Sequence, residues 1–218
     1  MKSRHDGTVN RDTPTIMPAQ DRAVGSRRVL TRRRFLQTAV GGIVATCAYT
    51  GFVEPFWTEV VHQRLTSPKL PCELQGIRLV QLSDLRILRN EMVEVKGLQI
   101  VGLDDLWARR GDPAVALSRV DQTRPTLVLS HNPDSVDLGD WRGYRGWVLS
   151  GHTHGGQCKP PFLPPPLLPV RNRRYTAGII PLSDGRTLYI NRGLGYLHQV
   201  RFNVRPEITI FTLEGSRA

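Results

Sequence analysis

The stretch Trp147-Val148-Leu149-Ser150-Gly151-His152-Thr153-His154-Gly155-Gly156-Gln157 decides the fold class. It begins with aromatic, β-branched and aliphatic residues, as a buried strand does, and then enters a turn rich in glycine. His152 and His154 lie two residues apart in this turn. The glycines let the backbone bring both imidazoles to one centre or to two adjacent centres. The stretch therefore predicts a metal site just past the end of a strand.

Two further strands are predicted to end on polar groups. Residues 77–82 lead into Ser83-Asp84, and residues 126–129 lead into Ser130-His131-Asn132-Pro133-Asp134. Other strands are expected at 98–103, 187–191 and 207–213, a helix at 112–120, and a connector with one or two helical turns at 54–75. Strands separated by helices or loops, with polar residues past their carboxyl ends, indicate a layered α/β fold with its site along one sheet edge.

Four residues at these strand ends are the candidate metal ligands: Asp84, His131, His152 and His154. Three imidazole nitrogens and one carboxylate suit Mn, Fe or Zn better than Ca. For the remaining histidines, His5, His62 and His198, we expect no role in the site.

The N-terminal region has the order of an export signal. Thr31-Arg32-Arg33-Arg34-Phe35-Leu36-Gln37 precedes an uncharged stretch, 35–53, and resembles the twin-arginine signal. We therefore expect residues 1–53 to direct the chain across, or anchor it to, the bacterial inner membrane, with the twin-arginine export machinery as a partner. The apolar part, 38–53, is short and mild for a spanning helix of about 20 residues. A cleaved signal and an uncleaved anchor both stay open, as does a cytoplasmic protein with a basic arm.

The net charge is less informative than its size suggests. The 218 residues contain 30 Lys and Arg against 19 Asp and Glu, a net charge of +11, which favours an anionic partner. Nine of the basic and three of the acidic residues lie in 1–37, so more than half of the excess belongs to the leader. A basic anion-binding protein is an alternative, but nucleic acid is not the expected partner.

The stretch Pro160-Pro161-Phe162-Leu163-Pro164-Pro165-Pro166-Leu167-Leu168-Pro169 is predicted to be a stiff surface loop, because proline has no amide donor for a central strand or helix. Its place after the histidines favours a wall or lid of the site over a proline-rich recognition ligand. Arg171, Arg173 and Arg174 follow it, either to attract a phosphate or as a solvated face.

These motifs together resemble the calcineurin-like metallophosphoesterases, and within them the bacterial envelope branch, over about 77–213. The resemblance rests on Leu82-Ser83-Asp84-Leu85, Leu88-Arg89-Asn90-Glu91, Val101-Gly102-Leu103-Asp104-Asp105, residues 129–134, 149–157, Tyr175 with Gly178, 191–195 and Pro206-Glu207-Ile208.

The resemblance implies a β-sandwich flanked by helices, occupying residues 76–215 after a linker at 54–75. It also implies two divalent metal ions that activate a hydroxide against phosphomonoesters or phosphodiesters, either small molecules or phospholipid-type substrates. In the family pattern Asp84 and His154 would hold the first metal, and His131 and His152 the second.

The sequence departs from that pattern before His131. Asp84-Leu85-Arg86 lacks the histidine of the family's Asp-x-His block. We also expect that no residues before His131 correspond to the family's Gly-Asp and Gly-Asn-His blocks. Only 46 residues separate Asp84 from His131. We interpret this as an internal deletion of central βα units that joins Leu85 to about Arg86. The expected result is a phosphoesterase with impaired activity, or, as the alternative, a catalytically inactive remnant.

Overall fold

The computed structural model describes residues 31–82, 88–196 and 198–215. The chain forms two compact units, Met1–Val40 and Gly41–Ala218. Helix α1, Arg32–Phe52, runs through the boundary between them, and none of its residues is buried. The apolar helical segment Arg32–Phe56 has the length and composition to cross a membrane, a test that a signal sequence also passes. The helix is longer than the apolar stretch 38–53 because it begins at Arg32, inside the arginine cluster.

Two β-sheets make up the unit Gly41–Ala218. The smaller sheet has the order β1-β9-β2, with β1 (Glu59–Ser67) parallel to β9 (Glu207–Gly215) and β2 (Arg78–Gln81) antiparallel to it. The larger sheet has the order β3-β4-β5-β6-β8-β7. Its strands are β3 (Glu91–Val95), β4 (Leu98–Gly102), β5 (Thr126–Leu129), β6 (Trp147–Ser150), β7 (Gly178–Pro181) and β8 (Thr187–Ile190). Strands β4, β5, β6 and β8 are parallel, and β3 and β7 close the edges antiparallel.

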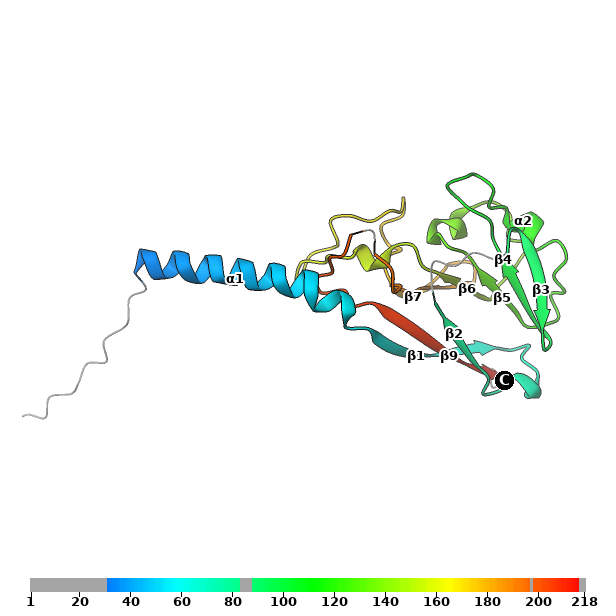
Figure 1. Cartoon of the computed structure of the whole chain (residues 1–218). Helices are drawn as coiled ribbons and strands as arrows, with labels where there is room; N and C mark the ends of the chain where they lie inside the picture. The colour runs from blue at the N-terminus through cyan, green and yellow to red at the C-terminus, as the bar shows by residue number, and fades with distance from the viewer. Residues whose placement is uncertain (1–30, 83–87, 197, 216–218) are drawn as a thin grey trace, which may run out of the picture. The chain divides into compact units, whose positions relative to one another are not determined.

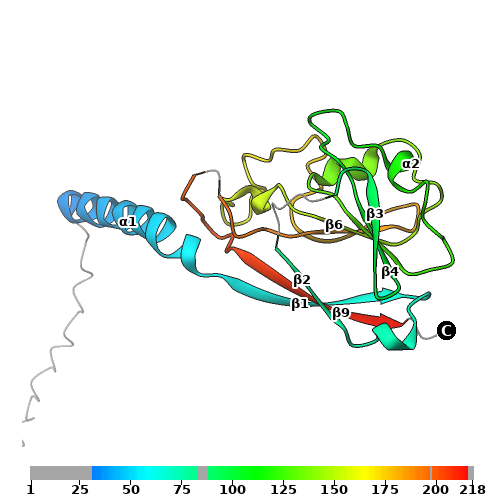
Figure 2. The same ribbon diagram turned by 45° about the vertical axis from the view of Figure 1, so that its right-hand side comes forward.

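The two sheets pack face to face (Figures 1 and 2). Successive side chains of a strand point to opposite faces, so each central strand serves two cores. Leu127, Leu149 and Tyr189 face the smaller sheet, where Phe211 packs edge-on against Tyr189 with ring centroids 5.0 Å apart. The alternate residues Val128, Val148 and Leu188 are fully buried on the outer face. This arrangement confirms the layered α/β fold.

The outer face of the larger sheet is covered by one short helix, 3-10 turns and loops. The helix expected at 112–120 is a single turn, α2 (Pro113–Ala116). Asp112 caps it by accepting a hydrogen bond from the Val115 amide at 3.1 Å. After Ala116 the amides of Ser118 and Val120 bond three residues back, so the chain tightens into turns.

The connector expected at 54–75 has its helical turns, but it also contains a strand that was not expected. Strand β1 occupies nine of these residues, between the 3-10 helices η1 (Glu54–Phe56) and η2 (Cys72–Leu74). Glu59 of β1 lies opposite Glu207 of β9, so this strand is stabilised by a partner that is remote in sequence. Local patterning carries little signal for such a pair. Strands β3 and β7, at the two edges of the larger sheet, were also not expected.

Strand β2 lies at an edge of the smaller sheet. Within the described residues it pairs with β9 alone, and its neighbour Leu82 and its own Val80 are 49% and 58% exposed. An apolar edge of this kind is normally covered or paired.

Candidate metal centre

His131 and His152 meet at the carboxyl ends of two neighbouring parallel strands. His131 follows β5 by two residues and His152 follows β6 by two residues. The Gly151 amide donates to the His131 carbonyl at 3.1 Å, which continues the sheet pairing to the site. Nδ1 of His152 then lies 2.9 Å from Nε2 of His131, with the ring centroids 4.7 Å apart. Parallel strand order thus turns two distant histidines into one pair.

The other nitrogen of His152 faces the Pro-rich loop. Nε2 of His152 lies 3.0 Å from the carbonyl oxygen of Pro169. A carbonyl oxygen can only accept a hydrogen bond, so the neutral ring carries its proton on Nε2. The lone pair is therefore on Nδ1, the nitrogen that faces His131. A metal-binding histidine characteristically donates its second ring N–H to a carbonyl or carboxylate in this way.

Trp107 also contacts His152. The two rings meet edge to face, at 83° with centroids 4.5 Å apart. The turn that carries Trp107 is held by two carboxylates: Asp104 accepts from the Asp105 amide at 2.7 Å, and Asp105 accepts from the Trp107 amide at 2.9 Å. These aspartates therefore stabilise a turn. Trp107 carried no signal in the sequence, whereas the Pro169 carbonyl belongs to the Pro-rich loop that was expected to form a wall or lid of the site.

The backbone of the glycine-rich turn is held in unusual conformations. His152 and His154 have φ values of 68° and 48°, in the left-handed region that non-glycine residues rarely adopt. Between them, buried Thr153 donates its hydroxyl to the Thr176 carbonyl at 2.6 Å. His154 begins the 3-10 helix η4 (His154–Gly156). Strained residues of this kind persist where the surrounding structure fixes them, and they cluster at functional sites.

Asp134 ties the Pro-rich loop to the strand that carries His131. It lies in the 3-10 helix η3 (Pro133–Asp137) and is 7% exposed. Its two carboxylate oxygens accept the amides of Arg171 at 2.6 Å and Asn172 at 3.0 Å. These amides follow Pro169 by two and three residues, so the bonds position the carbonyl that orients His152.

Tyr175 strengthens the same junction. Its hydroxyl donates to Asp137 Oδ1 at 2.6 Å, and its ring is 3% exposed. Burial, together with the neighbouring Asp137 carboxylate, raises the pKa of Tyr175 to about 12. The hydroxyl therefore stays protonated and continues to donate throughout the physiological range.

The structure brings together two of the four predicted ligands and leaves the set incomplete. His131 and His152 are in direct contact, and His154 lies two residues further on. Asp84 lies outside the described residues. Among residues 31–82, 88–196 and 198–215, no group of three or more His, Cys, Asp or Glu side chains is arranged to hold a metal ion. The described residues alone therefore do not fit a complete metal centre.

One correction concerns the missing Gly-Asp block. No counterpart of this block was expected before His131, but the sequence contains Gly111-Asp112 there. The structure gives Asp112 a different task, as the exposed N-cap of α2. Its backbone amide donates a hydrogen bond to Asn90 Oδ1 at 3.2 Å. This dipeptide is a helix cap in the described fold.

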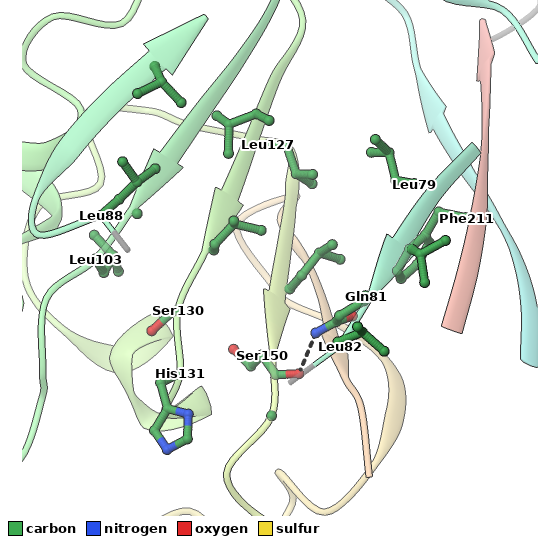
Figure 3. A pocket seen from close by; sticks show the side chains of 17 residues that line it. Leu79, Gln81, Leu82, Leu88, Leu103, Leu127, Ser130, His131, Ser150 and Phe211 are labelled. Atoms are coloured by element: carbon green, nitrogen blue, oxygen red, sulfur yellow. Dashed lines mark hydrogen bonds between the residues drawn. The ribbon is translucent and has the colours of Figure 1, made fainter. Parts of the chain in front are cut away.

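An apolar pocket of about 480 Å³ opens between the two sheets beside His131. Leu79 and Phe211 line it from the smaller sheet, and Leu103 and Leu127 line it from the larger sheet (Figure 3). At its polar end the Gln81 side chain donates to the Ser150 carbonyl at 3.0 Å, close to Ser130 and His131. Among the described residues, the pocket leaves apolar surface unfilled between β2 and the larger sheet.

Comparison with known proteins gives relatives of one kind. The chain is 40% identical to "Phosphodiesterase YaeI" of Escherichia coli over 117 residues, which is 53% of this chain and 41% of that protein. It is 39% identical to "Uncharacterized metallophosphoesterase YkuE" of Bacillus subtilis over 121 residues, 55% of this chain and 41% of that protein. It is 34% identical to "UDP-2,3-diacylglucosamine pyrophosphatase LpxG" of Chlamydia muridarum over 143 residues, 62% of this chain and 43% of that protein.

The chain thus spans less than half the length of these relatives. No family model matches the chain, and no solved structure matches it. The relatives share the chemistry of phosphoester or pyrophosphate cleavage by name, and the mixed sheets of this chain fit an α/β fold of that kind. Sequence similarity therefore supports the calcineurin-like metallophosphoesterases as the family of the matched part of this chain.

Proposed function

We propose that this chain is a metal-dependent phosphoesterase of low activity, with Asp84, His131, His152 and His154 as its metal ligands. The observation that carries the proposal is the contact between His131 and His152 at the carboxyl edge of the sheet, with the Nδ1 lone pair of His152 aimed into the pair. When bound, a divalent metal supplies charge that stabilises a transferring phosphoryl group. The protein's own part is to fix His152 between Trp107 and the Pro169 carbonyl.

The proposed activity is low because ligands are missing. The family's Asp-x-His histidine and Gly-Asn-His block are absent from the sequence, and the described residues gather no set of three ligands. We attribute the loss to an internal deletion near Leu85 and Arg86. The exposed edge of β2 and the unfilled pocket beside it support this interpretation, since removed βα units would leave such surface uncovered.

The proposed substrate is a phosphate ester with a lipid part. LpxG, by its name, acts on a diacylated glucosamine nucleotide, and it resembles this chain over 143 residues. The N-terminal features support a location at the bacterial envelope. The twin-arginine pattern precedes a helix with the length and composition of a membrane span or signal, and we propose export by that route.

Hydrolysis of bis(p-nitrophenyl) phosphate by the full chain tests the proposal. We expect slow release of p-nitrophenol that depends on added Mn²⁺ and falls at least about tenfold in His152→Ala. His62→Ala is the matched control, because His62 is exposed on β1. Release that is equal in the wild type and His152→Ala would contradict the proposal.

An inactive remnant is the second candidate, and the incomplete ligand set among the described residues favours it. The same assay separates the two. A remnant gives no Mn²⁺-dependent release above the His152→Ala background, while its thermal unfolding stays cooperative.

A further inference from the structure

The Pro-rich loop projects apolar side chains into solvent next to the candidate centre. Phe162 is fully exposed, at 105% of its reference area, and Leu167 and Leu163 are 79% and 60% exposed. Isolated exposed apolar residues are common, but three within six positions of one stiff loop are not explained by packing. Prolines on both sides limit the conformational entropy that such a loop loses when it binds.

The base of the loop is fixed firmly to the domain. Buried Pro165 packs so closely on Gly156 that a Cβ there would come within 2.3 Å of the Pro165 Cβ. Arg173 donates to the Pro165 carbonyl at 2.7 Å, and the Pro169 carbonyl meets His152. The loop is thus anchored at two points, with Phe162 and Leu163 before the first anchor and Leu167 between the two.

The conformation of Phe162 is costly and directs it outward. Its φ of 65° lies in the left-handed region, within a turn closed by the Leu163 amide and the Pro160 carbonyl at 3.3 Å. A bulky residue in that region is a strained exception. In this strained conformation the Phe162 ring is not buried against any part of the described structure.

Basic side chains flank the apolar tips. Lys159 comes before the loop, and Arg171 and Arg174 come after it, all three exposed. Arg171 and Arg174 hold the loop through their backbone amides, which donate to Asp134 and Asn172. Aromatic and aliphatic tips with flanking cations match the boundary between acyl chains and anionic lipid headgroups.

We propose that residues 159–174, which are the Pro-rich loop and its basic flanks, form a membrane-docking element. Phe162, Leu163 and Leu167 insert among the acyl chains of an anionic lipid surface. Lys159, Arg171 and Arg174 bind its headgroups. The occupant is a lipid surface because charge complementarity and apolar tips occur together on one rigid loop. Docking would place His152, bonded to Pro169, at the level of the headgroups. The proposal concerns binding and does not depend on metal or on catalysis.

The test measures how deeply the loop tip enters a bilayer. The full chain is used with Cys47→Ser, Cys72→Ser and Cys158→Ala, and with an environment-sensitive fluorophore on Phe162→Cys. The vesicles contain phosphatidylglycerol and phosphatidylcholine, and a chelator removes metal. A label on Val115→Cys, which is 54% exposed on α2, is the matched control. Because α1 can itself hold the chain at a vesicle, label depth is read instead of binding.

We expect the emission from position 162 to shift to the blue and to fall at least about twofold with brominated acyl chains, while position 115 is unchanged. Leu167→Ser and Arg171→Gln/Arg174→Gln should each reduce the response, the latter only on anionic vesicles. If the emission wavelength of the label at position 162 stays the same with every vesicle as in buffer alone, the proposal is overturned. A blue shift without vesicles that rises with protein concentration would also overturn it, in favour of a second copy of the chain.

Discussion

Nδ1 of His152 lies 2.9 Å from Nε2 of His131, although 21 positions separate the two residues in the chain. The pair depends on neighbouring strands β5 and β6 and on the Pro169 carbonyl, which fixes the proton of His152 on Nε2. The geometry of the pair therefore makes a claim about its protonation that can be measured directly.

The first prediction concerns that proton. In the metal-free chain, neutral His152 should be the Nε2–H tautomer, because the Pro169 oxygen can only accept. Long-range ¹H–¹⁵N correlation spectra of the imidazole nitrogens check this, with exposed His62 as a reference for a ring that samples both tautomers. A spectrum in which His152 is protonated on Nδ1 would show that the loop does not orient the ring.

The second prediction concerns Asp134, which accepts two amides of the loop base. Asp134→Ala should lower the free energy of unfolding by about 2 kcal/mol, because two part-buried amide donors lose a charged acceptor. Asp134→Asn, which keeps one acceptor oxygen, should recover part of the loss. Urea unfolding measures both, and Asp140→Ala at an exposed turn is the control. Equal stability of Asp134→Ala and Asp140→Ala would show that the junction contributes little.

The third prediction concerns Glu207 in β9. Its buried carboxylate accepts from the Tyr189 hydroxyl at 2.5 Å, the Thr209 hydroxyl at 2.6 Å and Arg192 Nε at 2.5 Å. Glu207→Ala should destabilise the fold by about 3 kcal/mol, since it removes the acceptor of Arg192 Nε and of two buried hydroxyls.

Glu214→Ala, on the same strand, is the matched control for Glu207. Its 3.6 Å ion pair with Arg64 is solvent-exposed and should contribute less than about 1 kcal/mol. Thermal or urea unfolding of the two variants side by side gives the comparison. If both cost the same, the buried network does not stabilise the junction of the sheets.

The fourth prediction is a dependence on pH. Arg192 donates to Glu59 Oε2 at 3.0 Å and, together with Arg205, holds the pKa of that carboxyl below its ordinary value of 4.5. A carboxyl with a lowered pKa in the folded state stabilises the fold above its ordinary pKa. That contribution is lost as the pH falls through the folded pKa.

The stability difference between the wild type and Glu59→Gln should therefore be constant above about pH 5 and shrink as the pH falls below 4.5. Urea unfolding between about pH 6 and pH 3 provides the measurement. A difference that stays constant over the whole range would mean that Glu59 titrates alike in the folded and unfolded chain.

Local sequence predicted the central strands because their patterns are strong and their ends are marked. Thr126–Leu129 matches β5, and the strand at Trp147 ends where the glycine-rich turn begins. The same marks predicted that His131 and His152 share one edge of the sheet. Strand β1 escaped prediction because its partner β9 is remote in sequence and its solvent-facing positions are mixed in polarity.

The sequence predicted that the Pro-rich loop lies beside the site, but it did not predict which atoms contact His152. Trp107 and the Pro169 carbonyl reach His152 from loops whose course depends on Asp104, Asp105 and Asp134. Such courses follow from tertiary hydrogen bonds, which no local pattern records. Gly111-Asp112 shows the converse, because a dipeptide with the letters of a metal block serves as a helix cap.

The most direct test of the central claim is the stoichiometry of Mn²⁺ bound to the full chain, measured by equilibrium dialysis and elemental analysis, with His152→Ala/His154→Ala as the control. A phosphoesterase centre that has lost part of its ligand set should bind about one equivalent, and the double variant should bind none. Two tightly bound equivalents would contradict the proposed loss of ligands, and no bound metal in the wild-type chain would contradict the proposed phosphoesterase centre.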